Sequence, residues 1–246
     1  MKDKKILIFT ATYNESENIA ELIHSIKNIC PTADILIIDD NSPDKTFEIV
    51  QELKQKNSNI FSIKRKSKMG LDTAHKEAYD YASKNNYDYI ITMDADLSHD
   101  PKEIKNFLNN LESYHFVIGS RYIKGGKCLM KGKRLMFSKY GNKLIKFLLN
   151  INCNEYTTSY RGFNIKKLKN FNLNLVKNKG YSFFMGTVFE IAANNYTIKE
   201  IPIIFKDRVA GKSKIPKIEI LRTLKNLFNL FLRKKLSKNF GAPTQN

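Results

Sequence analysis

Residues 35–40 read ILIIDD, and residues 89–96 read YIITMDAD. Each stretch is a short apolar run that ends in acidic side chains, a pattern typical of a buried parallel strand followed by a loop. In an open α/β sheet the carboxyl ends of parallel strands meet at one edge, where ligands bind. The two stretches therefore predict a parallel sheet that gathers Asp39, Asp40, Asp94 and Asp96 along this edge.

The pattern extends to both sides of these stretches. Further apolar runs alternate with segments of helical period, at residues 6–11, 60–63 and 116–118. This alternation predicts an α/β fold with a mostly parallel central sheet and helices on both faces. Two helix starts are indicated, by Ser42 before Pro43 and by Asp100 before Pro101.

After residue 119 the chain becomes more basic. We expect a mobile basic loop at residues 123–134 and a basic amphipathic helix at residues 135–150. A strand at residues 198–205 and a second amphipathic helix at residues 216–236 follow. This pattern predicts one α/β domain at residues 1–215 and an amphipathic interfacial helix at residues 216–238. A disordered tail is expected at residues 239–246.

Composition narrows the class of partner. The 246 residues suffice for one large domain, and 42 Lys and Arg against 24 Asp and Glu give a formal charge of +18. Such a balance indicates an anionic partner, which can be a nucleic acid, a membrane surface or a phosphorylated substrate. Charge alone does not separate these three.

Cysteine usage and hydropathy indicate a compartment. The three cysteines show no metal-ligand spacing and no even framework of disulfides, which favours a reducing environment. We expect no signal peptide after Met1, and no apolar run approaches the roughly 18–20 residues of a spanning helix. The sequence thus predicts a cytoplasmic protein that lies on the cytosolic face of a membrane.

The triplet formed by Asp94, Ala95 and Asp96 indicates a metal site. Two carboxylates that leave a strand on either side of one small residue can face the same way. Hard divalent cations prefer such oxygen ligands and can bridge them to a diphosphate. The sequence therefore predicts that Asp94 and Asp96 hold Mg²⁺ or Mn²⁺.

Five motifs occur in an order that is similar to a known family. They read ATYNE, IDDNSPD, MDADLSHDP, GSRY and DRVAGKSK, at residues 11–15, 38–44, 93–101, 119–122 and 207–214. Together they resemble family 2 glycosyltransferases, and more closely the dolichol-phosphate (polyprenol-phosphate) mannose synthases. The resemblance spans residues 6 to 220, and five motifs in register make it specific.

The resemblance implies a GT-A fold and inverting transfer of mannose from GDP-mannose to the phosphate of a polyprenol. It implies that Tyr13 and Glu15 contact the nucleotide and that Asp39 bonds the base. The full set expected around the nucleotide-sugar is Ala11, Tyr13, Glu15, Ile38, Asp39, Asp40, Asp94, Ala95, Asp96, Arg121, Arg208 and Lys214. Catalysis is expected from Asp96, Arg208 and Lys214, and contact with the acceptor phosphate from Arg121, Arg161, Arg208 and Lys214. The segment TSYRG, at residues 158–162, falls where that family has an acceptor-side motif, and a surface position is the alternative for Arg161.

Two positions depart from the pattern of that family. Ala11 stands where the family usually has Pro, and Ala210 stands where Tyr is common. Contacts made by those side chains are therefore not carried over to this chain.

The chemistry of a phosphate acceptor bears on His99. A phosphate is already ionised at neutral pH, so that transfer to it requires no strong general base. We therefore expect His99 to orient its loop rather than to move a proton. We also expect Phe183, Phe184 and Phe189 to be core residues. The segment that begins at Gly70 is either the entry to a helix or, as the resemblance implies, a part of the site near the donor.

Two alternatives remain open from the sequence. Another sugar, such as glucose or an N-acetylhexosamine, can be the transferred group, because motifs do not encode the shape of a sugar pocket. A nucleic-acid-binding α/β protein would explain the charge, but it leaves the acidic triplet unexplained and shows no nucleic-acid motif.

Overall fold

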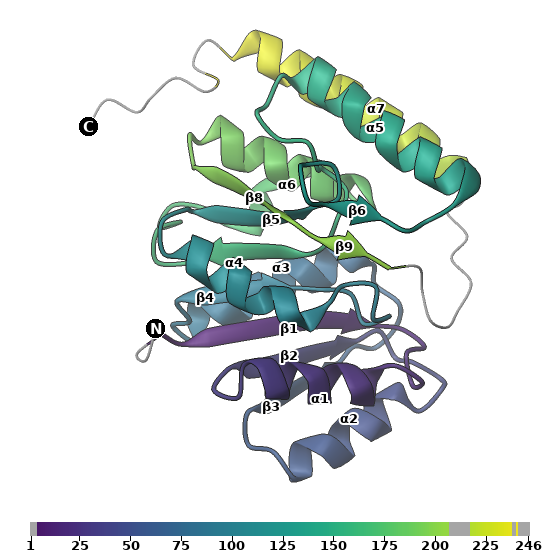
Figure 1. The fold of residues 1–246 in the computed structure, drawn as a ribbon, viewed down its shortest axis with the longest axis vertical. Coiled ribbons are helices and arrows are strands. Elements are labelled where there is room, and N and C mark those ends of the chain that lie inside the picture. Colours follow the sequence, from purple (N-terminus) through teal and green to yellow (C-terminus); the bar gives the residue numbers. More distant parts are fainter. Residues whose placement is uncertain (1–3, 207–216, 238–239, 241–246) are drawn as a thin grey trace.

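The computed structural model describes residues 4–206, 217–237 and 240. Its centre is a seven-stranded sheet of order β3-β2-β1-β4-β7-β5-β8 with helices on both sides (Figure 1), and β6 pairs with β9 in a small second sheet. The strands are β1 Ile6–Thr12, β2 Asp34–Asp39, β3 Ile60–Lys64, β4 Tyr89–Thr92, β5 Phe116–Ser120, β6 Lys127–Cys128, β7 Arg161–Asn164, β8 Ile198–Pro202 and β9 Ile204–Phe205. The helices are α1 Ile19–Ile29, α2 Thr46–Gln55, α3 Leu71–Lys84, η1 Pro101–Glu103, α4 Ile104–Leu111, α5 Gly132–Leu149, η2 Leu173–Leu175, α6 Ser182–Ala193 and α7 Lys217–Leu236.

Alternating side chains along the strands divide the core into two parts. In β2, Leu36 and Ile38 pack in the cluster that contains α3 and α6, whereas Ile35 and Ile37 pack with α1 and α4. All four are fully buried, and each such side chain contributes roughly 1.5–3 kcal/mol. The apolar run of β2 is continuous because helices cover both faces of the sheet, as the sequence predicts.

Parallel pairing aligns the carboxyl ends of β1, β2 and β4. Thr12 at the end of β1 pairs with Asp39, and Phe9 pairs with Thr92 at the end of β4. The loops that carry the two acidic pairs therefore leave the same edge of the sheet. This part of the sequence prediction is confirmed.

One central strand was not predicted. β7 lies antiparallel between β4 and β5, and its residues RGFN contain no apolar run. Strand periodicity cannot reveal such a segment, because neighbouring strands on both sides supply the pairing that its own composition does not indicate.

The two predicted helix starts have different outcomes. Asp100 caps η1, since its carboxylate accepts from the Lys102 N–H at 3.1 Å. The start at Ser42 is wrong, because α2 begins only at Thr46. The Ser42 hydroxyl donates instead to Asp39 at 2.6 Å.

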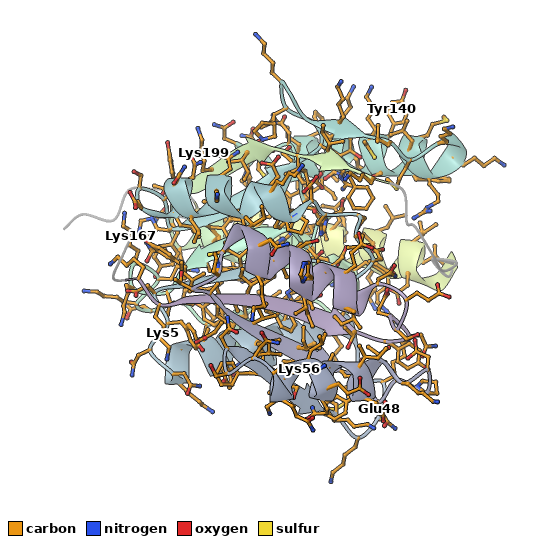
Figure 2. The ribbon with its side chains drawn as sticks, turned by 60° about the horizontal axis from the view of Figure 1, so that its bottom comes forward. Lys5, Glu48, Lys56, Tyr140, Lys167 and Lys199 are labelled. Atoms are coloured by element: carbon orange, nitrogen blue, oxygen red, sulfur yellow. The ribbon has the colours of Figure 1, made fainter. Side chains whose placement is uncertain are left out.

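α5 and α7 lie side by side at one end of the molecule (Figure 1), and α7 also packs on α6. Leu227 and Leu230 of α7 are buried, whereas Leu221 and Phe228 are 68 and 58% exposed. Tyr140 of α5 points outward (Figure 2). α7 therefore carries apolar side chains on two faces, of which one is directed at the core and one at the surface.

In the part of the chain that is described, no helix has the length and apolar character to cross a membrane. Within the loop predicted at residues 123–134, β6 pairs with β9 and α5 begins at Gly132. The basic connector at residues 207–216 lies outside the described residues, as does the predicted tail except for Phe240.

Candidate functional site

Three loops at the carboxyl edge of the sheet contain a residue in the left-handed backbone region. Asn14 follows β1 with φ of 61°, Asn41 follows β2 with 60°, and Leu97 follows β4 with 60°. Asn adopts this conformation readily, but for Leu it costs about 1–2 kcal/mol. Such strain persists where the surrounding contacts enforce it, which is common at functional sites. Here it turns the chain sharply after Asp96.

Asp39 is a fully buried carboxylate at this edge. It accepts hydrogen bonds from the Thr12 hydroxyl at 2.8 Å and from the Ser42 N–H at 2.8 Å, in addition to the Ser42 hydroxyl. These bonds tie the end of β1 to the loop after β2. They account for the burial of the charge, because a buried carboxylate is stable only when donors surround it. Its contact with a base stays a prediction.

Asp40 forms an internal ion pair. The Arg65 Nε donates to its carboxylate at 2.5 Å, and the same guanidinium donates to the Thr73 hydroxyl and the Gly70 carbonyl at 2.6 and 3.1 Å. Both side chains are buried. In this arrangement Asp40 pairs with the loop before α3, and its contact with the nucleotide stays a prediction. Gly70 precedes α3, in agreement with a helix entry at this point.

Asp94 is placed differently from the first acidic pair. Its side chain remains 33% exposed, and one carboxylate oxygen, Oδ1, accepts from the Ser159 hydroxyl at 2.5 Å. Its backbone N–H donates to Nδ1 of His99 at 3.0 Å. The structure therefore presents a carboxylate at the surface that is held from both its backbone and its side chain.

Asp96 lies deeper in the same loop and is buried, as is Ala95. Its Oδ1 accepts from the Ser98 hydroxyl at 2.5 Å and from the Ser98 N–H at 3.2 Å. This local turn is closed by the left-handed Leu97 and fixes the orientation of the Asp96 carboxylate.

His99 is a buried residue that organises this loop. Nδ1 accepts from the Asp94 N–H, and Nε2 lies 3.2 Å from the Thr158 hydroxyl. Burial lowers the pKa of His99 below its usual value, although the nearby carboxylates of Asp94 and Asp96 oppose this shift. The neutral ring serves as a link between two loops, which agrees with the orienting role expected from the sequence.

Arg121 is engaged by an internal carboxylate. Its Nε and one terminal nitrogen donate to the two oxygens of Glu155, each at 2.7 Å. Burial acts to lower the pKa of Arg121, but the adjacent Glu155 carboxylate outweighs burial and raises it. Both side chains are buried. In this arrangement Arg121 supports the Glu155 loop, and its contact with the donor diphosphate or the acceptor phosphate stays a prediction.

Arg161 is a core residue. Its side chain is 1% exposed, and it donates to the backbone carbonyls of Thr158, Phe184 and Tyr156 at 2.8, 2.8 and 3.0 Å. The sequence favoured either contact with the acceptor phosphate or a place on the surface. The structure contradicts both, because a phosphate has no access to this guanidinium.

The remaining nucleotide-set residues lie at the ends of β1 and β2. Tyr13 is exposed, and the Lys68 ammonium lies 4.0 Å from its ring centroid. Glu15 accepts from the Asn18 side-chain amide at 2.9 Å. Ala11 is partly buried and Ile38 is fully buried, so that Ile38 packs in the core. Of this group, Tyr13 presents the largest accessible surface to a ligand.

Lys206, the last described residue before the basic connector, lies beside the acidic loop. The Lys206 N–H donates to the Ser98 carbonyl at 3.1 Å, and its ammonium lies 3.3 Å from the Asp100 carboxylate. The ring of Phe205 packs edge-on against His99. Arg208 and Lys214 themselves lie outside the described residues. The last described residue before them nevertheless adjoins the Asp94–Asp96 loop.

The donor set of this loop fits a divalent cation. Asp94 and Asp96 supply the hard oxygen ligands that Mg²⁺ and Mn²⁺ prefer, and Asp94 is accessible. Over residues 4–206, 217–237 and 240, no group of three or more His, Cys, Asp or Glu side chains gathers for a metal. A cation held here would need its other ligands from substrate or water, as is usual for Mg²⁺ beside a phosphate.

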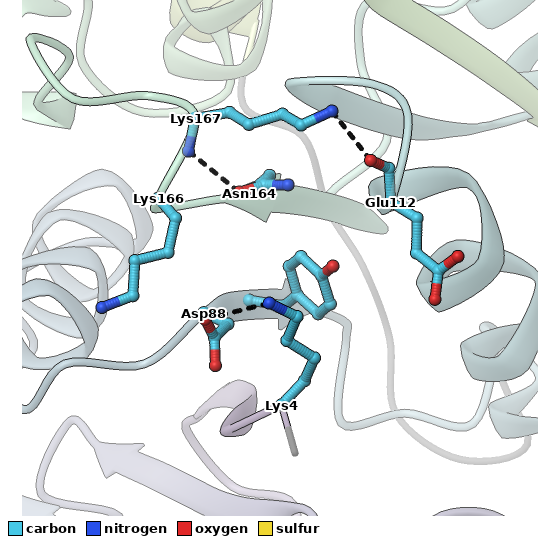
Figure 3. Close-up of a pocket in the computed structure, with 7 residues that line it drawn as sticks. Lys4, Asp88, Glu112, Asn164, Lys166 and Lys167 are labelled. Carbon is cyan, nitrogen blue, oxygen red and sulfur yellow. Dashed lines mark hydrogen bonds and ion pairs between the residues drawn. The ribbon is translucent and has the colours of Figure 1, made fainter. Parts of the chain in front are cut away.

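Two cavities lie away from this loop. A cavity of about 320 Å³ opens at the opposite end of β4 and is lined by Lys4, Asp88 and Lys167 among others (Figure 3). Another of about 520 Å³ lies beside β3 and α3. The first combines lysines with acids that already pair with them, such as Asp88 with Lys4 at 3.7 Å. Neither cavity contains the motif residues Asp94 or Asp96.

Three supporting residues escaped the sequence analysis. Ser159 lies in the segment TSYRG, which the sequence singled out only as a candidate acceptor motif. Glu155 and Arg65 lie in no motif, and a buried partner of a buried charge has no signature in a single sequence. Phe183, Phe184 and Phe189 are buried, as predicted.

The amino-acid sequence is similar to those of known glycosyltransferases. The family model described as glycosyl transferase family 2 matches residues 7–171. A polyprenol monophosphomannose synthase of Mycolicibacterium smegmatis is 31% identical over 242 residues, with 97% of this chain and 91% of the relative covered. An undecaprenyl-phosphate mannosyltransferase of Micrococcus luteus is 30% identical, with 86 and 87% covered.

Solved structures are similar in fold at lower identity. Glucosyl-3-phosphoglycerate synthase from Mycobacterium tuberculosis superposes with a TM-score of 0.67 at 14% identity, covering 99% of this chain and 82% of that one. A mannosyltransferase from Pyrobaculum calidifontis, in complex with GDP-Man and Mn²⁺, gives 0.61 at 14% identity, with 95 and 64% covered. The predicted GT-A fold is confirmed.

Proposed function

The chain belongs to the glycosyl transferase family 2, whose model matches residues 7–171, and we propose that it transfers mannose from GDP-mannose to a polyprenyl phosphate. The observation that carries this proposal is similarity over 97% of the chain to a polyprenol monophosphomannose synthase. Membership of an enzyme family sets aside the reading as a nucleic-acid-binding protein without catalytic activity.

In this proposal Asp94 and Asp96 hold Mg²⁺ or Mn²⁺ at the edge of the sheet. The cation would supply positive charge where the diphosphate leaving group gains negative charge, which is a large source of rate enhancement. The protein contributes the fixed position of the two carboxylates. Ser98 fixes Asp96 at 2.5 Å, and Ser159 fixes Asp94 at the same distance.

Arg208 and Lys214 are the cations that we assign to the diphosphate and the acceptor phosphate. The contact of Lys206 with Ser98 supports this assignment, because it starts the basic connector beside the acidic loop. We do not assign Arg121 and Arg161 to this set, since their guanidinium groups are buried against Glu155 and backbone carbonyls.

No general base is assigned. The acceptor phosphate is ionised at neutral pH and can attack the sugar carbon without losing a proton. His99, the histidine of the acidic loop, engages both ring nitrogens within the protein. This arrangement supports a mechanism in which positioning and charge, rather than proton transfer, lower the barrier.

We further propose that α5 and α7 lie against the cytosolic face of a membrane. The outward faces of both helices are apolar, with Phe137 and Phe147 at 68 and 80% exposed on α5 and Leu221 on α7. Lys and Arg side chains flank these faces, and anionic headgroups attract them. A lipid-borne acceptor would thereby enter the site from the adjacent surface.

The proposal is tested with a panel of GDP- and UDP-sugars, each offered with polyprenyl phosphate and Mn²⁺. We expect product formation from GDP-mannose with the wild-type protein, and a rate at least about 100-fold lower with Asp94→Asn. Turnover of a UDP-sugar alongside inactivity with GDP-mannose would reject mannose as the transferred group. Transfer that survives complete chelation of divalent cations would reject the metal role.

A further inference from the structure

Residues 155–161, here called the cradle segment, run alongside the acidic loop and are anchored at both ends by buried arginines. At the first end, Arg121 donates to both oxygens of Glu155. At the other end, Arg161 donates to the carbonyls of Tyr156 and Thr158. Each anchor is buried in the core, so that both ends of the segment are fixed to the protein interior.

Glu155 also fixes the turn that follows it. One of its oxygens accepts from the Thr157 N–H at 3.0 Å and from the Thr158 N–H at 3.2 Å. Burial acts to raise the pKa of Glu155, but the Arg121 charge outweighs it and lowers the pKa. The carboxylate is therefore ionised and organises the backbone of the cradle segment.

Ser159 connects this rigid segment to the strand and to the acidic loop. Its carbonyl accepts from the Thr92 hydroxyl at 2.5 Å, and its own hydroxyl donates to Asp94 Oδ1 at 2.5 Å. Thr158, one residue earlier, meets His99, which accepts the Asp94 N–H. Two consecutive residues of the cradle segment thus fix the side chain and the backbone of Asp94.

This attachment matters because Asp94 is the exposed member of the acidic loop. An exposed carboxylate samples several rotamers, and ordering it when a ligand binds costs free energy. The Ser159 hydroxyl is already in place at Oδ1, while Oδ2 lies 3.8 Å from a His99 nitrogen that accepts rather than donates. The carboxylate is therefore oriented in advance of ligand binding.

We propose that Ser159 is a positioning residue that orients Asp94 for a divalent cation, with Thr158 and His99 fixing the backbone of the same residue. The inference rests on the proposed function, since it assumes a cation at Asp94. Partners that orient a metal ligand typically contribute 10- to 100-fold to metal affinity. The cradle segment thereby acts on the donor side of the reaction, where the sequence favoured an acceptor role.

The test measures Mn²⁺ affinity in the presence of GDP, by electron paramagnetic resonance of free Mn²⁺. We expect Ser159→Ala to raise the dissociation constant of Mn²⁺ about tenfold or more. Ser159→Thr, which keeps the hydroxyl, should restore affinity to within about threefold of wild type. Ser62→Ala is the matched control, because the Ser62 hydroxyl meets only Gln51 near the sheet edge, and it should leave affinity unchanged.

Equal affinity of Ser159→Ala and wild type would overturn the inference. If Ser159→Ala does not fold, Ser159→Cys keeps the volume with a weak donor and should show the same loss; retained affinity in that variant would overturn the inference equally. Parallel sugar-transfer assays separate the two proposals. Ser159-dependent Mn²⁺ binding without mannose transfer contradicts the proposed function alone, whereas mannose transfer with Mn²⁺ binding independent of Ser159 contradicts the inference alone.

Discussion

The two acidic pairs look alike in the sequence, but they differ in the structure. Asp39 ends β2 and Asp40 follows it, and both are buried, the first against hydroxyl and amide donors and the second against Arg65. Asp94 and Asp96 follow β4, and Asp94 keeps a third of its side chain exposed. Position at a strand end selects candidate acids, and internal partners leave Asp94 the most exposed of the four carboxylates, since Asp39, Asp40 and Asp96 are all buried.

The difference has a simple electrostatic origin. A carboxylate that leaves water must receive hydrogen bonds or an opposite charge. Arg65 supplies that charge to Asp40 from the loop that follows β3. The carboxylate of Asp94 instead accepts from a neutral hydroxyl, that of Ser159, and it keeps its negative charge accessible to a cation.

The largest expected effect is the loss of sugar transfer when Asp94, in the loop after β4, is replaced. Asp94→Asn should reduce sugar transfer at least about 100-fold, the scale for losing one contact that stabilises the transition state. The fold should persist, because an amide oxygen still accepts from Ser159. Transfer rate and thermal unfolding measured on the same preparation check this. An unchanged rate would remove Asp94 from the site.

The next effect is on stability and concerns Asp40. Asp40→Asn should lower the free energy of unfolding by about 3 kcal/mol, because Arg65 would be left buried without its charge partner. Urea unfolding measures this loss. The double variant Asp40→Leu with Arg65→Met should recover much of it. An unchanged unfolding midpoint together with lost nucleotide affinity would show that Asp40 binds ligand after all.

A buried histidine outside both acidic pairs, His75, is expected to make the stability of the fold depend on pH. His75 packs against the rings of Phe9 and Phe184, and burial lowers its pKa to about 3. The unfolded chain, with a pKa near 6.5, binds the proton first. The stability that neutral, buried His75 allows is therefore fully present above pH 6.5. It is lost as the pH falls from 6.5 toward 3, because protons then bind the unfolded chain.

His75→Phe removes this titration while keeping an aromatic ring in the cluster. Between pH 7.5 and pH 5 the wild type should lose about 2 kcal/mol more stability than the variant. Denaturant unfolding at the two pH values measures this difference. An identical loss in both proteins would place the pH dependence elsewhere.

The smallest expected effect contrasts the two faces of α7. Phe228→Ser, on the outward face, should weaken binding to vesicles of phosphatidylglycerol about tenfold, because an exposed Phe adds apolar area to the bilayer contact. Leu227→Ala, on the inward face, should instead destabilise the fold by about 2–5 kcal/mol. Vesicle sedimentation measures the effect of Phe228→Ser on binding, and urea unfolding measures the effect of Leu227→Ala on stability. Unchanged vesicle binding by Phe228→Ser would argue against membrane contact through α7.

Much of the fold could be predicted because it depends on local pattern. The apolar runs that became β1, β2 and β4 are buried on both faces, and burial of that kind requires continuous apolar sequence. β7 could not be predicted, because its pairing comes from β4 and β5 rather than from its own residues. The parallel register then explains why both acidic pairs lie at one edge.

The site was predicted in part for the same reason. Asp94 and Asp96 were found because the acids and their strand are adjacent in sequence. The internal partners of Asp40, Arg121 and Arg161 could not be predicted. Asp40 and Arg121 pair with charges distant in the chain, such as Glu155 for Arg121 at a separation of 34 residues. Arg161 instead donates to backbone carbonyls. Sequence spacing does not show which charges are already neutralised inside the protein.

The most direct test of the central claim is binding of Mn²⁺ in the presence of GDP to wild type, Asp94→Asn and Asp40→Asn. We predict that Asp94→Asn loses affinity about 100-fold or more, whereas folded Asp40→Asn stays within about threefold of wild type. Wild-type affinity in Asp94→Asn, or an equal loss in folded Asp40→Asn, would contradict the assignment of the cation to the loop after β4.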